Sequence, residues 1–308
     1  FMRKIVTSYI KPDIDGISSM YAYAELLRKM GYNAEYYYEG QARKEVQIVL
    51  ETYGIELKTV SQIFSDDEVI LVDTNGLRYL PKAINANQIK EVIDHHKMNE
   101  WLSKQKDIKI QIEMIGAAAT LVAERFKNNN IDISRESAIL LYNGIISNTM
   151  NLKISMTTQK DKDMAHWLKQ KYPEITEEKT KAIFIKKSEI TDRLREEMEV
   201  EFKDEFITIS WSMGQLEIAN VEEFLNRNEE KVRAILKKVK DENNVDYISV
   251  NCMDIINGYT IILAENEATA NIISDAINVK FIKLKAKIVH GIPSVHLSRI
   301  HREKQKGI

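Results

Sequence analysis

Short apolar runs that end in an acidic residue constrain the fold of this chain more than any other feature. VILV (residues 69–72) leads directly into Asp73, and IKEVI (residues 89–93) leads into Asp94. Apolar runs also occur at residues 4–10, 34–38 and 108–114. Stretches of helical periodicity separate these runs, at residues 17–27, 42–53, 117–127, 135–146 and 158–171. Strands that alternate with helices predict an α/β fold with a doubly wound parallel sheet.

A charge-dense stretch with poor strand signals, from about Tyr172 to Arg195, marks the expected domain boundary. We therefore expect a first domain over residues 2–185, a linker over 186–195 and a second domain over 196–308.

The second domain shows its own alternation of strand and helix signals. The expected strands cover residues 206–210 and 215–219, followed by a helix at 221–240 that Asn220 would cap. Two apolar stretches on either side of Asn257-Gly258 predict a β-hairpin, because Asn-Gly is a strong signal for a two-residue turn. A helix at residues 267–277 and a basic strand would follow.

Composition excludes several classes of function. The 308 residues carry a net charge of −2, which disfavours nonspecific nucleic-acid binding. Cys252 is the only cysteine, so an internal disulfide is impossible and a reducing, cytoplasmic setting is expected. No apolar run approaches the length of a membrane-spanning helix, and no secretion signal is evident, so we expect no membrane association.

Charge is nevertheless segregated along the chain. Residues 283–308 hold seven Lys or Arg and one acid, Glu303, which is a net charge of +6, so the remainder carries −8. This pattern predicts a carboxylate cluster for cations in the first domain and a basic segment for an anion in the second.

Four segments place candidate ligands where an α/β sheet presents them, just beyond the ends of strands or at a helix terminus. They are Asp13-Ile14-Asp15, Asp73, Asp94-His95-His96 and Ser147-Asn148-Thr149. Taken singly, a D-x-D before a helix is often a turn with an N-cap, and a strand-end Asp often only turns the chain. The adjacent histidines are more informative, because one ring can bind a metal while the other faces an anion and the preceding Asp orients a ring.

The order and spacing of these segments resemble the DHH phosphoesterase superfamily, in particular its branch with a DHHA2 C-terminal domain, which contains family II inorganic pyrophosphatases and exopolyphosphatases. Residues 144–168 look like the fourth motif and its continuation, and residues 216–224 and 301–305 look like parts of the second domain. The resemblance implies a smaller C-terminal α/β domain with a mixed sheet, and an active site in the interdomain cleft.

The resemblance also implies a chemistry for the site. It is that of a phosphoanhydride hydrolase with two divalent ions, Mn²⁺ or else Mg²⁺ or Co²⁺, and a metal-bridging water as nucleophile. Asp73 would be shared by both ions and Asp13 would serve one of them. The other ion would be held by Asp15, His95 and Asn148.

The substrate implied by the resemblance is polyphosphate, pyrophosphate or a small phosphate ester. His96 would face the phosphate, and Asp94 would orient the histidines. The remaining phosphate would be bound by cations of the second domain, namely Arg302, Lys304, Arg299 and Lys203. A homodimer would also fit the pyrophosphatase relatives.

Three positions depart from the family pattern. Tyr9 stands where the pyrophosphatases have a metal-binding histidine, Asn148 where active relatives have an Asp, and Glu303 where a Lys is expected. Each change removes a favourable contact with metal or phosphate. They keep open a catalytically degenerate member that binds a phosphate ligand or a protein partner. A phosphodiesterase of the oligoribonuclease or phosphoadenosine phosphatase type ranks lower, because residues 289–305 lack that branch's glycine-rich motif.

Overall fold

Five parallel strands form one sheet in the N-terminal part of the chain, in the order β2-β1-β3-β4-β5. The structure is a computed structural model that describes residues 2–189, 199–202 and 211–288. Its internal contacts divide the chain into two units, residues 1–183 and 184–308. The strands are β1 (Lys4–Thr7), β2 (Ala34–Tyr37), β3 (Glu68–Val72), β4 (Ile89–Asp94) and β5 (Lys109–Ile112). The predicted parallel sheet is confirmed.

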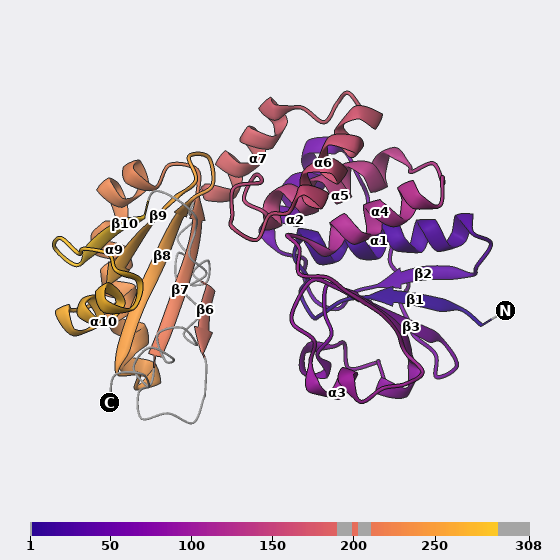
Figure 1. Cartoon of the computed structure of the whole chain (residues 1–308), viewed down its shortest axis with the longest axis horizontal. Coiled ribbons are helices and arrows are strands. Elements are labelled where there is room, and N and C mark those ends of the chain that lie inside the picture. Colours follow the sequence, from indigo (N-terminus) through magenta and orange to yellow (C-terminus); the bar gives the residue numbers. More distant parts are fainter. Residues whose placement is uncertain (1, 190–198, 203–210, 289–308) are drawn as a thin grey trace. The chain divides into compact units, whose positions relative to one another are not determined.

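Helices cover the two faces of this sheet unequally (Figure 1). One side carries α1 (Ile14–Lys29), α2 (Lys44–Tyr53), α4 (Ala118–Asn128), α5 (Arg135–Asn148) and α6 (Gln159–Lys171). The other side carries α3 (Glu100–Ser103) and two 3₁₀ turns, η1 (Leu77–Tyr79) and η2 (Ala86–Gln88). Val69 and Leu71 pack against Leu102 of α3, and strand alternation turns Ile70 and Val72 to the opposite face. Because both faces are covered, residues 69–72 are apolar without alternation.

The strand order reverses between β1 and β3. The chain leaves β1 toward β2 on one side, whereas β3, β4 and β5 follow one another on the other side. Loops that leave the carboxyl ends of β1 and β3 therefore diverge and leave a crevice, which is where ligands bind in open α/β sheets. The segments that begin at Asp13 and Asp73 lie at this switch point.

The second unit is built on a mixed sheet in the order β10-β9-β8-β7-β6. Only the β7–β8 pair is parallel among its described pairs. Its strands are β6 (Glu199–Phe202), β7 (Trp211–Ile218), β8 (Tyr247–Asp254), β9 (Tyr259–Ala264) and β10 (Lys285–Ile288). Its helices are α9 (Val221–Asn243) and α10 (Glu267–Ile277), while α7 (Glu177–Ser188) crosses from the first unit into the second. The predicted mixed sheet is confirmed.

Local signals in the second unit agree with the structure, with one correction. The Asn220 side chain accepts a hydrogen bond from the Glu223 amide and caps α9, as predicted. The predicted hairpin forms, but Asp254 pairs with Tyr259, so its loop has four residues (255–258) rather than two. The Asp254 carboxylate stabilises this longer loop by accepting the amide N–H groups of Ile256 and Asn257. The predicted strand at residues 206–210 lies outside the described residues, as do residues 190–195 of the predicted linker.

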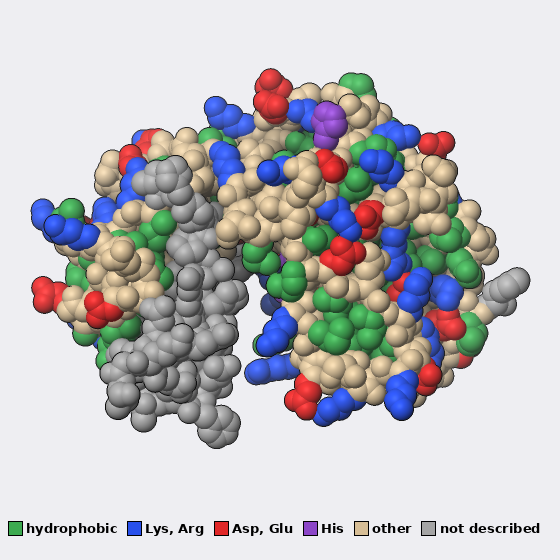
Figure 2. All heavy atoms as spheres, in the orientation of Figure 1, with side chains coloured by type: hydrophobic (Ala, Val, Ile, Leu, Met, Phe, Trp, Pro, Cys, Tyr) green, Lys and Arg blue, Asp and Glu red, His purple; other side chains and the backbone are tan. Residues whose placement is uncertain are grey.

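The surface and the helices bear on two expected exclusions. Within the described parts of the chain, no helix combines the length and apolar character needed to cross a membrane. On the face of the first unit drawn in Figure 2, acidic and basic side chains are interspersed. A single face does not test the expected exclusion of nonspecific nucleic-acid binding, which stays a prediction.

Candidate metal centre

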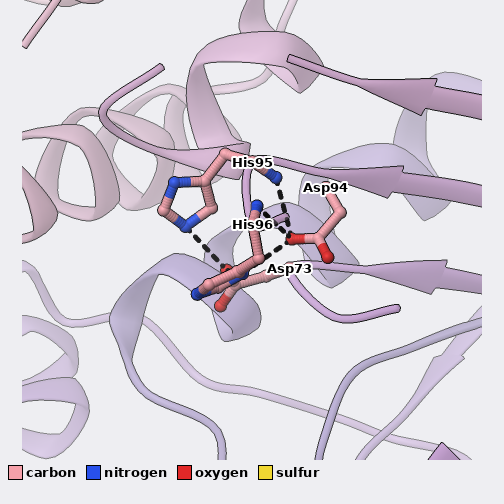
Figure 3. A group of neighbouring side chains, drawn as sticks. All are labelled: Asp73, Asp94, His95 and His96. Atoms are coloured by element: carbon pink, nitrogen blue, oxygen red, sulfur yellow. Dashed lines mark hydrogen bonds and ion pairs between the residues drawn. The ribbon is translucent and has the colours of Figure 1, made fainter. Parts of the chain in front are cut away.

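Asp73 leaves β3 in a conformation that turns its side chain toward β4. Its amide N–H donates to the Ile93 carbonyl oxygen at 3.0 Å, so the residue continues the pairing of the two strands. Its φ of 55° lies in the left-handed region, which Asp and Asn tolerate better than most residues. The Asp73 side chain is buried, and its Oδ1 atom lies 3.3 Å from Nε2 of His95. Figure 3 shows the two groups facing each other.

Asp94 orients the two histidines that follow it. Its Oδ1 atom accepts the backbone N–H of His95 and Nδ1–H of His96, both at 2.8 Å (Figure 3). The His95 side chain is 7% exposed and the His96 side chain is 58% exposed, and the centroids of the two rings lie 4.2 Å apart. Burial alone would raise the pKa of Asp94, but hydrogen bonds from His96 and Asn75 hold it below its usual range. Asp94 is therefore a buried anion that fixes the position of His96.

His95 is held in the tautomer that suits a metal ligand. Its Nδ1 atom lies 3.1 Å from the Ile115 carbonyl oxygen, which can only accept a hydrogen bond, so Nδ1 carries the proton. The lone pair of Nε2 then points at Asp73 Oδ1, 3.3 Å away, and at Asp15 Oδ2, 3.7 Å away. Three acceptors that face one another in a buried site fit a cation between them.

Asp15 lies in the first turn of α1 and is 1% exposed. Its two carboxylate oxygens accept the amide N–H groups of Ala119, at 2.7 Å, and Ala118, at 2.9 Å. These amides begin α4, whose own cap residue, Ala117, makes no side-chain cap. A carboxylate from α1 therefore caps the N-terminus of α4, where the helix dipole favours negative charge.

The site holds more negative charge than its protein contacts neutralise. Burial raises the pKa of Asp15 to about 6, and the hydrogen bonds from the amides of α4 oppose the shift. Burial, followed by the charges of Asp15 and Asp13, raises the pKa of Asp73 well above its usual range. Buried carboxylates side by side repel each other unless a cation lies between them. The oxygen and imidazole donors match the ligands of Mn²⁺ and Mg²⁺, so the residues present fit a divalent ion.

Asp13 and Tyr9 form the side of the site nearest β1. Asp13 caps α1, and its Oδ1 atom accepts the amide N–H groups of Asp15 and Gly16. The Tyr9 hydroxyl accepts the Asp13 amide at 3.2 Å. Burial and the neighbouring carboxylates raise the pKa of Tyr9 far above its usual value, so the phenol stays neutral. Tyr9 therefore brings neither negative charge nor an imidazole nitrogen to this position.

Asn148, the last residue of α5, presents its amide nitrogen to the ligand atoms. Its Nδ2 atom donates to Asp15 Oδ2 and to the Gly116 carbonyl oxygen, both at 3.0 Å, and lies 3.3 Å from His95 Nε2. The NH₂ group thus satisfies the same acceptors that an ion would bind. A half-turn of the amide would exchange its nitrogen for its oxygen, so Asn148 could bind an ion only after giving up these hydrogen bonds.

The structure brings together predicted residues and adds supporting ones. Asp73, Asp94, His95 and His96 offer ligand atoms within 4.8 Å of one another among the described residues. Sequence reasoning missed Asn75, whose side chain donates to Asp94 and to the Lys97 carbonyl oxygen. Its place two residues after Asp73 was the available signal. It also missed the backbone of residues 115–119, which no side-chain pattern reveals. The four predicted phosphate-binding cations, Lys203, Arg299, Arg302 and Lys304, lie outside the described residues, as does Glu303.

Replacing Asp73 with Asn should stabilise the metal-free protein and abolish Mn²⁺ binding. Asn keeps the left-handed backbone, removes a buried charge beside Asp15 and can donate to His95. We expect a rise in melting temperature of about 2–4 °C for each kcal/mol of repulsion removed. Thermal unfolding after chelation and calorimetric titration with Mn²⁺ measure the two effects. Asp107→Asn on the exposed surface is the control, and a lower melting temperature for the Asp73 variant would contradict the charge argument.

Replacing Asn148 with Asp should have the opposite pair of effects. The added carboxylate beside Asp15 destabilises the metal-free protein and strengthens Mn²⁺ binding by about tenfold or more, because ligand charge sets the affinity for hard cations. Isothermal titration with Mn²⁺ measures the gain. Asn148→Ala, which removes the amide without adding charge, should not show it. Equal affinity in the Asp variant and the wild type would exclude residue 148 from the coordination shell.

Comparisons with known proteins agree on one family. Residues 3–145 match the model of the DHH family, N-terminal domain. A probable manganese-dependent inorganic pyrophosphatase of Streptococcus thermophilus is 28% identical over 277 residues, which cover 88% of this chain and 89% of that protein. The manganese-dependent inorganic pyrophosphatase of Bacillus subtilis is 28% identical over 275 residues, with the same coverage of both chains.

Solved structures share the fold over nearly the whole chain. A crystal structure from Methanococcus jannaschii, described as that of a family II inorganic pyrophosphatase, has a TM-score of 0.73 at 23% identity and covers 97% of this chain and 98% of its own. An exopolyphosphatase-related protein of Bacteroides fragilis has a TM-score of 0.51 at 14% identity and covers 98% and 91%. The first unit of the chain thus matches the DHH family, N-terminal domain, and over most of its length the chain is similar to manganese-dependent inorganic pyrophosphatases.

Proposed function

We propose that the chain is a manganese-dependent hydrolase of phosphoanhydrides, of the pyrophosphatase or exopolyphosphatase type. One observation carries the proposal: the unprotonated nitrogen of His95 and the buried carboxylates of Asp15 and Asp73 face one another. The relatives that match along most of the chain bear the name manganese-dependent inorganic pyrophosphatase, which supports both the metal and the reaction class.

In this proposal the ligand positions are taken by three carboxylates, one imidazole and one amide. Asp15, His95 and Asn148 would hold one ion, Asp13 would hold a second, and Asp73 would be shared between them. Two ions so held would supply an activated water as the nucleophile and neutralise charge on the phosphoryl oxygens. The hydrogen bonds from α4 to Asp15 keep one ligand in place before any ion arrives.

His96 is the proposed contact to the phosphate. Burial alone would lower its pKa, but the hydrogen bond to Asp94 and the charge of Asp73 raise it above the usual value for a histidine. The exposed ring can therefore present a positive charge to an incoming phosphate while Asp94 holds its orientation. Arg302, Lys304, Arg299 and Lys203 remain proposed phosphate ligands on the strength of the resemblance alone.

Two observations bear on the choice between pyrophosphate and longer phosphate chains as the substrate, and the first is Tyr9. A neutral phenol replaces the imidazole that the pyrophosphatases use, which favours an exopolyphosphatase-type preference over a dedicated pyrophosphatase. The curated relatives favour pyrophosphate. Polyphosphate as a substrate and a homodimer both stay predictions from the resemblance.

Asn148 favours a second candidate function, a degenerate member that binds a phosphate-containing ligand without turning it over. Its amide nitrogen already satisfies Asp15 and faces His95. A ligand set whose acceptors are already hydrogen-bonded in this way depends less on an ion for its stability.

Purified protein with Mn²⁺ should release phosphate from pyrophosphate or tripolyphosphate, and Asp73→Asn should lower the rate to background. The reason is that the shared carboxylate cannot be replaced by a neutral amide. Phosphate release at matched substrate concentrations gives the preference between the two substrates. Silence on a panel of phosphoanhydrides, phosphomonoesters and dinucleotides with Mn²⁺, Mg²⁺ and Co²⁺ would end the enzyme proposal. Faster turnover of short RNA would instead favour the phosphodiesterase alternative.

The double variant Tyr9→His with Asn148→Asp separates the two candidates. A degenerate protein should gain phosphate release from pyrophosphate, because both lost ligands return. A respecialised enzyme should lose activity on its own preferred substrate. Unchanged kinetics in the double variant would remove Tyr9 and Asn148 from either explanation.

A further inference from the structure

One short segment of backbone contacts three of the proposed metal-binding side chains. The Ile115 carbonyl oxygen accepts from His95 Nδ1, and the Gly116 carbonyl oxygen accepts from Asn148 Nδ2. The amides of Ala118 and Ala119 donate to Asp15. These three side chains come from β4's end, α5 and α1, so residues 115–119 are the common support of ligands that lie far apart in sequence.

Asp161 holds this segment from behind. Its side chain is fully buried, and its Oδ2 atom accepts the Gly116 amide at 3.0 Å. Its Oδ1 atom accepts the Thr120 hydroxyl of α4 at 2.6 Å. The two bonds join Asp161 to residues 116 and 120, beside the backbone groups that contact His95, Asn148 and Asp15.

The packing around Gly116 leaves little freedom for the segment to shift. A Cβ atom at residue 116 would lie 2.4 Å from Thr149 Cγ2 and 3.0 Å from the Asp161 carboxyl group. Thr149 follows Asn148, so Gly116 packs between Asp161 and the C-terminal end of α5. A displacement of this loop would move the supports of His95 and Asp15 together.

A purely local role for Asp161 also exists. It occupies the third position of α6 and forms a capping box with Thr158, whose amide and hydroxyl donate to Oδ2 at 2.7 and 2.8 Å. That box explains an acid at this position without any link to a metal. The bonds to Gly116 and Thr120 are not part of the box, because they leave α6 for the ligand-supporting segment.

We propose that Asp161 is a positioning residue of the metal centre, which acts through residues 115–119 on His95, Asp15 and Asn148. The inference rests on the proposed function only in taking those three side chains as metal ligands. Outer partners of metal ligands set their orientation, and their loss typically weakens metal affinity by about 10–100-fold.

Three variants separate positioning from helix capping. Asp161→Ala removes both roles. Thr158→Ala weakens the capping box but leaves the bonds to Gly116 and Thr120. Asp161→Asn can keep its oxygen on the backbone amides and turn its NH₂ to the Thr120 hydroxyl, which can accept. Each variant is titrated with Mn²⁺ alone by calorimetry well below its melting temperature, and the visible spectrum of the Co²⁺-loaded protein reports ligand geometry.

We expect Asp161→Ala to weaken Mn²⁺ binding by about 10–100-fold and to alter the Co²⁺ spectrum. Asp161→Asn should restore both to near wild type, and Thr158→Ala should lower only the melting temperature. Wild-type affinity and spectrum in folded Asp161→Ala would overturn the inference while leaving the proposed function intact. Should Asp161→Ala not fold, a loss of Mn²⁺ affinity of about tenfold or more in Thr158→Ala would overturn it instead, because that variant keeps both bonds from Asp161 to the segment. Failure of the wild type to bind Mn²⁺ or Co²⁺ would overturn both proposals.

Discussion

The structure of the first unit accommodates one unfavourable interaction, the repulsion between two buried carboxylates. Asp15 and Asp73 are 1% and 3% exposed; burial raises the pKa of both carboxyl groups, and the charge of Asp15 adds to the shift at Asp73. The fold tolerates this charge because the first amides of α4 bind Asp15 and because Asn148 donates to it. The strand order, the N-terminus of α4 and the backbone of residues 115–119 together hold these two carboxylates in place. Their repulsion lowers the stability of the fold, and a bound cation would offset that loss.

Much of this arrangement follows from local sequence rules. The unbroken apolar run before Asp73 requires a strand covered on both faces, and the run before Asp94 extends the same sheet. Parallel strands present their carboxyl ends at one edge of the sheet, so the acids at the ends of β3 and β4 are expected to lie close together. The helix cap at Asn220 could also be predicted from the sequence, because the capping residue directly precedes the helix that it caps.

Other features depend on contacts that no linear pattern records. The tautomer of His95 is set by the carbonyl oxygen of Ile115, which any residue type would offer. The orientation of the Asn148 amide follows from Asp15 and the Gly116 carbonyl oxygen, which lie 133 and 32 residues away in sequence. The hairpin loop is longer than Asn-Gly suggests because Asp254 captures two loop amides. In each case a backbone or distant partner overrides the local preference.

The left-handed backbone at Asp73 limits the mutations open to this position. Most side chains would strain the turn after β3, whereas Asn and Gly fit it. A single base change converts an Asp codon into an Asn or a Gly codon, so the least strained substitutions are also within one mutational step. Loss of the Asp73 carboxylate can thus leave the scaffold folded, so a descendant of this chain could lose that ligand atom and still keep the protein for another use.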